Sequence, residues 1–82
     1  MAYVKSEQNK LRAGGARDAL VAFGEDTRAQ VEHDLNFREC RDEIITDLIC
    51  DLLHYAEQNG NDGPLLLKTA LAGFEIESEG EI

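Results

Sequence analysis

Three acidic side chains and one histidine recur at helical spacing in the middle of the chain. They are Glu43, Asp47, Asp51 and His54. Because a helix turns about 100° per residue, we expect these residues to form one stripe along a helix face, called here the acidic stripe. Carboxylates four residues apart beside an imidazole can share a divalent metal ion, but helical metal sites draw ligands from at least two helices. We therefore interpret the stripe first as a solvated surface, with a protein-docking surface and a metal site completed across a dimer as the alternatives.

Other residue types that could perform chemistry do not form a recognisable set. Cys40 and Cys50 are ten residues apart, so on one helix they lie about 15 Å apart along the axis, beyond the roughly 7 Å limit for a disulfide, and we expect free thiols. The segment NGNDG lacks the glutamate and the first aspartate of a calcium loop, and no phosphate-binding glycine loop or Ser-His-Asp set is present. The sequence therefore favours a protein that is not an enzyme and has no cofactor.

The acidic stripe belongs to a long amphipathic segment, residues 36–58, which we predict to be one central helix. Its start is predicted at Asn36, with Glu39 as the second half of a capping box, and Gly60 is expected in the left-handed position after its end. Large apolar residues fill an arc of about 180° opposite the stripe, interrupted by Arg41. We predict this arc to be a self-association face, and its members are Phe37, Ile44, Ile45, Leu48, Ile49, Leu52, Leu53 and Tyr55.

Shorter elements are expected on both sides of the central helix. Before it, Gly14-Gly15 is expected to interrupt the chain, leaving one or two short N-terminal helices. After it, Pro64 suits the first turn of a helix over about residues 64–74, which would return antiparallel and close an αα-hairpin. Residues 75–82 are predicted to be a mobile acidic tail. The fold class is therefore all-α, with residues 1–82 as a single small helical domain.

The length of the chain favours association. A chain of 82 residues buries a smaller fraction of its surface than a typical larger domain, so its core must be thin. The apolar arc is also wider than one neighbouring helix needs. We therefore predict a homo-oligomer, most simply a two-fold dimer, and keep as the alternative a monomer whose N-terminal segment covers the arc.

Charge is distributed unevenly along the chain. Residues 1–41 carry no net charge, whereas residues 42–82 carry all of the net charge of −9. Direct binding to nucleic acid is therefore disfavoured, and attraction to a basic protein surface is favoured. The chain has no signal-peptide pattern and no apolar run of the roughly 18 residues that span a bilayer, so we expect a cytoplasmic protein without membrane contact.

The second half of the central helix and the segment after it resemble a known pattern. DLICDLLHYAEQNG followed by LLLKTALAGFEIE, within residues 47–77, is similar to a group of small uncharacterised bacterial and phage proteins. Their motif is D-L-x-x-D-L-x-H-[YW] and a following Asn/His-Gly, then a short Ala-rich helix. The matching residues are Asp47, Asp51, His54, Tyr55 and Gly60. The resemblance implies a helical hairpin and a bacterial or phage origin, and it provides no support for a catalytic activity, because no function is known for the group.

These observations favour a small acidic interaction or regulatory protein that self-associates and docks a basic protein surface. One alternative is an acidic inhibitor that imitates the charge of nucleic acid. Another is a divalent-metal-dependent hydrolase whose site uses the acidic stripe of two copies across a dimer interface.

Overall fold

Four α-helices make up the fold. The computed structural model describes the backbone of residues 2–79 and the side chains of residues 7–79. Its helices are α1 (Ala2–Glu25), α2 (Val31–Asp34), α3 (Arg38–Gln58) and α4 (Gly63–Ser78), and the described residues contain no strand. The all-α prediction is therefore confirmed.

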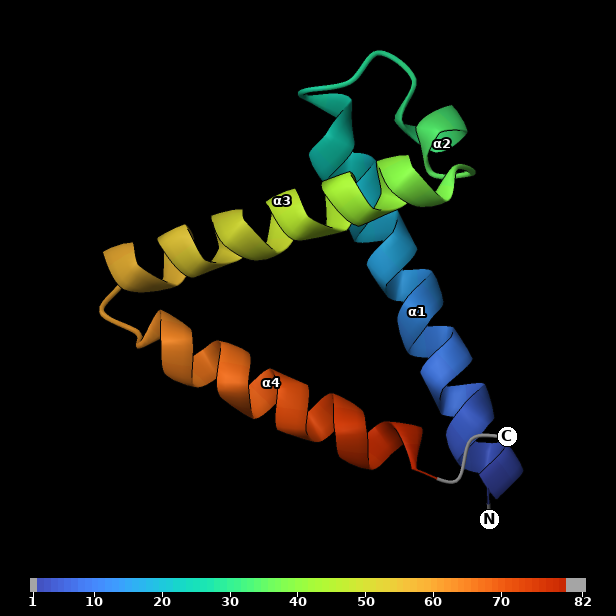
Figure 1. The fold of residues 1–82 in the computed structure, drawn as a ribbon, viewed down its shortest axis with the longest axis vertical. Helices are drawn as coiled ribbons and strands as arrows, with labels where there is room; N and C mark the ends of the chain where they lie inside the picture. The colour runs from blue at the N-terminus through green and yellow to red at the C-terminus, as the bar shows by residue number, and fades with distance from the viewer. Residues whose placement is uncertain (1, 80–82) are drawn as a thin grey trace.

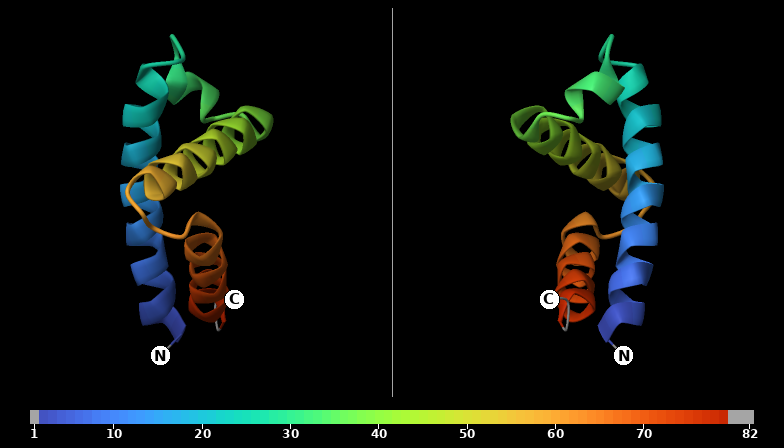
Figure 2. Two further views of the ribbon diagram at one scale, coloured as in Figure 1. Left: turned by 90° about the vertical axis from the view of Figure 1, so that its left-hand side faces the viewer. Right: turned by 90° about the vertical axis from the view of Figure 1, so that its right-hand side faces the viewer.

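The three long helices form the sides of a triangle. In Figure 1, α1, α3 and α4 enclose a central gap, and the single turn of α2 lies near the corner where α1 and α3 meet. The molecule is a slab measuring 40 × 35 × 18 Å. Figure 2 shows α1 on one side of this slab and α4 on the other, with α3 inclined between them.

Helix α1 is longer than predicted, because Gly14-Gly15 does not interrupt it. It runs for 24 residues as one helix. Each glycine disfavours a helix by only about 1 kcal/mol relative to alanine, and the surrounding residues are mostly helix formers such as Ala, Leu, Lys and Arg. The C-terminal end of α1 also packs on α2 and α3, and this tertiary contact stabilises the helix as a unit. The prediction of separate short N-terminal helices around a Gly-Gly break is wrong.

Helix α3 begins two residues later than predicted, and Asn36 does not cap it. Phe37 is the N-cap, in an extended conformation and without a side-chain capping bond. The backbone N–H of Asn36 instead donates to His33 O at 3.0 Å, and its side-chain amide donates to Glu32 O at 3.5 Å. Asn36 therefore belongs to the turn that follows α2, which removes it from the start of α3.

The turn between α3 and α4 follows its sequence signals closely. Gly60 has a positive φ of 80°, as expected. The N–H of Asn61 donates to Ala56 O at 2.9 Å and that of Gly60 to Glu57 O at 3.2 Å, which together form a Schellman motif. Asp62 then caps α4 by accepting a hydrogen bond from the N–H of Leu65 at 3.0 Å, and Pro64 lies in the first turn.

Helix α4 turns back from α3 but diverges from it, as the two arms of a V (Figure 1). The antiparallel αα-hairpin of the prediction is therefore not confirmed. Helix α4 also continues four residues past Phe74, so that residues 75–78 of the predicted tail are helical. The side-chain amide of Asn9 donates a hydrogen bond to the backbone oxygen of Glu77 at 2.8 Å, and Arg12 forms an ion pair with the Glu77 side chain at 2.7 Å. These two contacts link α4 to α1. The tail from residue 80 onward lies outside the described residues.

The hydrophobic core is confined to one corner of the triangle. Val31 and Leu35 from the α2 region pack with Ile44 of α3, and Leu20, Val21 and Phe23 of α1 complete the cluster. Elsewhere, among the described residues, Ala56 is the remaining buried apolar side chain. None of the described helices is both long enough and apolar enough to cross a membrane. The two other corners therefore have no comparable core, and most of the large apolar residues of α3 and α4 are exposed.

Candidate interaction surfaces

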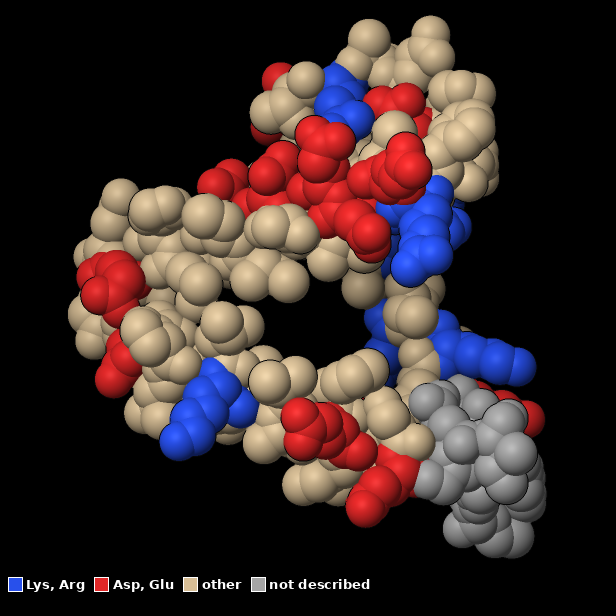
Figure 3. All heavy atoms as spheres, viewed as in Figure 1, with Lys and Arg blue, Asp and Glu red and all other residues tan. Residues whose placement is uncertain are grey.

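The acidic stripe lies on solvent-exposed positions of α3. Glu43, Asp47, Asp51 and His54 are all exposed. Figure 3 shows acidic side chains gathered along the outer edge of α3, on the side away from the central gap. Because four positions at this spacing share one face of a helix, the structure holds the stripe together as the sequence predicts.

One member of the stripe, Glu43, is paired within the chain. Arg28, in the loop before α2, binds Asp34 at 3.2 Å and Glu43 at 3.4 Å. The hydrogen bond to Asp34 is the main cause that raises the pKa of Arg28 above its usual value, and the charge of Glu43 acts in the same direction. In the described part of the chain Asp47, Asp51 and His54 make no ion pair. These three residues are therefore the part of the stripe that is available to another molecule.

The stripe does not form a metal centre within one chain. The described residues contain no group of three or more His, Cys, Asp or Glu side chains that could hold a metal ion. Successive stripe residues lie about a turn apart along α3. The carboxylate that α2 brings near Glu43, that of Asp34, is bound with it to Arg28. Cys40 and Cys50 are free thiols. The metal site assembled across two copies stays a prediction.

The predicted self-association face of α3 is divided by the fold. Ile44 is 1% exposed and belongs to the core, and Leu48 and Leu53 are half-buried. The other five members, all exposed, are Phe37, Ile45, Ile49, Leu52 and Tyr55. Phe37 additionally makes an edge-to-face contact with His33, with the ring centroids 5.1 Å apart. Most of the face is therefore open to a partner. Its most buried residue, Ile44, is instead covered by the core of its own chain.

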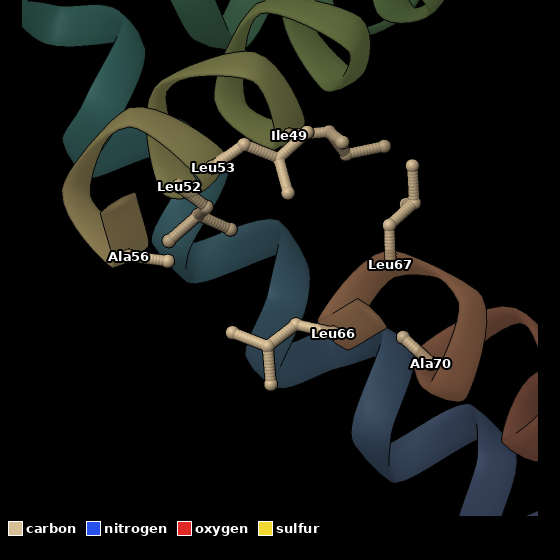
Figure 4. A pocket seen from close by; sticks show the side chains of 7 residues that line it. All are labelled: Ile49, Leu52, Leu53, Ala56, Leu66, Leu67 and Ala70. Carbon is tan, nitrogen blue, oxygen red and sulfur yellow. The ribbon is translucent and has the colours of Figure 1, made fainter. Parts of the chain in front are cut away.

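A second apolar surface, contributed by α4, was missed by the analysis of the sequence. Where α3 and α4 diverge, a cavity of about 200 Å³ opens between them (Figure 4). All of its lining residues are apolar: Ile49, Leu52, Leu53, Ala56, Leu66, Leu67 and Ala70. The run Leu65-Leu66-Leu67 is the signal that could have found it, because three consecutive leucines cannot all face one neighbouring helix.

Arg41 makes no ion pair with any described residue, although it lies within the apolar arc. It lines a hollow between α1 and α3 together with Arg17, Leu20 and Ile45. Two arginines therefore line a partly apolar hollow at this corner, and neither forms an ion pair with a carboxylate in the described part of the chain.

Comparisons of the chain with protein-family models, with curated proteins and with solved structures found no match. The resemblance of residues 47–77 to small bacterial and phage proteins stays a prediction. The functional argument for this chain therefore rests on its two surfaces, the acidic stripe and the exposed apolar residues of α3 and α4.

Proposed function

We propose that this chain is a non-enzymatic interaction module that self-associates and binds a basic protein surface. The observation that carries the proposal is the division of α3 into two exposed faces of opposite chemistry. The acidic stripe lies on one face, and Ile45, Ile49 and Leu52 lie on the other. A partner bound to one face does not obstruct the other, so both interactions can occur in one assembly.

The acidic face supports binding to a cationic protein. The net charge of −9 lies in residues 42–82, and among the described residues Asp47 and Asp51 have no cation of their own. Exposed charges of one sign attract an oppositely charged surface over roughly a Debye length, about 8 to 10 Å at physiological salt. Such a field accelerates encounter and favours basic partners over acidic ones.

The apolar face supports self-association. Large apolar side chains that are more than a third exposed occur throughout α3 and α4, whereas the core contains few residues. Ile49, Leu52, Leu66 and Leu67 adjoin one another around the cavity between α3 and α4. Exposed apolar residues that adjoin in this way mark interaction sites in soluble proteins. A second copy brings the same apolar surface, and two-fold association covers both at once.

Asp47 and Asp51 provide the direct test of basic-partner docking. Proteins captured from a cell lysate at low salt are identified, and their affinity for purified Asp47→Asn/Asp51→Asn protein is measured by calorimetry. Loss of two charges at the contact is expected to weaken binding by about tenfold. Glu7→Gln/Asp18→Asn is the matched control, because it removes two exposed acidic charges from α1. Its net charge is therefore the same as that of the Asp47→Asn/Asp51→Asn protein.

The controls also separate the proposal from its alternatives. Equal weakening by the two double variants would contradict docking through the stripe, as would binding that does not weaken between 50 and 500 mM salt. Competition by duplex DNA for the captured partner would favour an inhibitor that imitates nucleic-acid charge. Stoichiometric Mn²⁺ or Zn²⁺ in native mass spectra, lost in Asp51→Ala or His54→Ala protein, would favour the metal-dependent hydrolase.

A further inference from the structure

The hollows at the three corners of the triangle open onto one central space. Ala13 and Ala16 of α1 line both the hollow beside Phe74 of α4 and the hollow beside Ile45 of α3. The third corner is the apolar cavity between α3 and α4. Figure 3 shows the opening, with uncharged side chains along the edges that α3 and α4 turn toward it. We call this space, lined by α1, α3 and α4, the central opening.

The chain exposes far more surface than a compact monomer of its size. A folded monomer of 9.1 kDa has an accessible surface of about 4,900 Å², whereas this chain has 6544 Å². Its radius of gyration is 14.4 Å, compared with about 11.7 Å for a compact chain of this length. The excess of about 1,600 Å² is twice the roughly 800 Å² that each partner buries in a standard interface. Two copies that each buried this excess would form an interface in the size range of obligate dimers.

Helix α4 needs cover on more sides than its own chain provides. From Gly63 to Phe74, Lys68 is the only charged residue of the helix. Leu65 is 56% exposed and Leu71 is 55% exposed, and these residues project at about 120° to each other around the helix axis. A helix that is apolar around most of its circumference belongs in a protein interior.

The other two long helices are poor occupants of an apolar opening. The outer face of α3 carries the acidic stripe, and α1 carries exposed charged residues that include Lys10 and Asp18. The corner between α1 and α3 presents Arg17 and Arg41 without an ion-pair partner in the described part of the chain. An α4 helix from another molecule offers Glu75, directly after its apolar part, to these two cations.

We infer that the central opening of each copy is covered by helix α4 of a second copy, reciprocally, in a two-fold dimer. The two slabs stack by their broad faces, and each α4 is enclosed between its own α3 and the opening of its partner. The acidic stripes stay on the outer edges, where their like charges are farthest apart. This inference deepens the self-association part of the proposed function and rests on it.

The first test is the oligomeric state of the unmodified chain and of two variants, by sedimentation at 1 to 100 µM. We expect a dimer for the unmodified chain. Leu71→Asp places a charge in the proposed contact twice per dimer and should raise the dissociation constant by at least about 100-fold. Leu11→Asp is the control, since Leu11 is 77% exposed on the side of α1 that does not line the central opening, and it should remain dimeric. Circular dichroism checks that both variants keep their helices.

The second test locates the contact between copies in the unmodified chain. Its result therefore does not depend on whether a substituted chain folds. In a mixed dimer of ¹³C-labelled and unlabelled chains, filtered NOE spectra should show contacts between copies from α4 methyl groups to those of Ile45 and Leu20. Monomers at 100 µM would overturn both the self-association and this inference. A dimer that survives Leu71→Asp, or whose contacts between copies avoid α4, would overturn this inference and leave self-association standing. Docking of a basic protein is tested separately, through Asp47 and Asp51.

Discussion

At Gly24, α1 lies close against Val31 of α2. A Cβ atom at this position would overlap the side chain of Val31, which is itself buried in the core. Gly14 and Gly15, in the same helix, have open space where a Cβ would stand. The three glycines of α1 therefore have different roles: one permits packing, and two only weaken the helix.

Alanine substitutions at these glycines should change stability in opposite directions. Gly24→Ala should lower the free energy of unfolding by about 1 to 3 kcal/mol, because Val31 must move within a packed cluster. Gly15→Ala should raise it by about 0.5 to 1 kcal/mol, because alanine favours the helix interior. Denaturant unfolding at a fixed protein concentration measures both. A stabilising Gly24→Ala would contradict the close packing of α1 on α2.

At the scale of elements, the turn between α3 and α4 is determined by local hydrogen bonds. Besides the Schellman motif and the Asp62 cap, the side chain of Glu57 accepts a hydrogen bond from the N–H of Gly63 at 2.7 Å. Gly63 is buried against Glu57 and Leu53. These contacts fix where α4 begins, and with it the angle at which the two helices diverge.

Loss of the Asp62 cap should destabilise the start of α4. Asp62→Ala removes the acceptor for the N–H of Leu65 and is expected to cost about 1 kcal/mol. For a domain of this size, that lowers the midpoint of thermal unfolding by about 4 to 8 °C. Asp62→Asn keeps a side-chain oxygen at the cap and should recover most of the loss. Equal losses in the two variants would show that the charge, and not the hydrogen bond, is responsible.

At the scale of the whole molecule, folding and association are expected to be coupled. A monomer with so small a core gains little from burial, whereas the covered central opening adds a second apolar interior. When the folded state is a dimer and the unfolded state is a monomer, dilution favours unfolding.

The midpoint of thermal unfolding should therefore depend on protein concentration. From the average unfolding enthalpy per residue, we expect a fall of about 4 °C for each tenfold dilution. Differential scanning fluorimetry or circular dichroism at 1, 10 and 100 µM measures the midpoint. A midpoint that stays constant over this range would indicate that the monomer folds alone, against the coupling proposed here.

Several features followed from the sequence because their causes lie within a few residues. The helical period of residues 38–58 separates the acidic stripe from the apolar arc, and both are found on α3. Gly60 and Pro64 mark the turn and the start of α4, since positive φ and a fixed φ are properties of single residues. The free thiols of Cys40 and Cys50 follow from their spacing.

Other features were decided by contacts between segments that are distant in the sequence. Asn36 is held by the turn after α2 and so cannot cap α3, and α1 continues through Gly14-Gly15. Ile44 meets α1 and α2 and enters the core, whereas Ile45 beside it stays exposed. Helical period determines which residues share a face, but only the packing of the three helices determines which part of that face is covered. That packing leaves the central opening, and the need to cover it is a property of the tertiary structure alone.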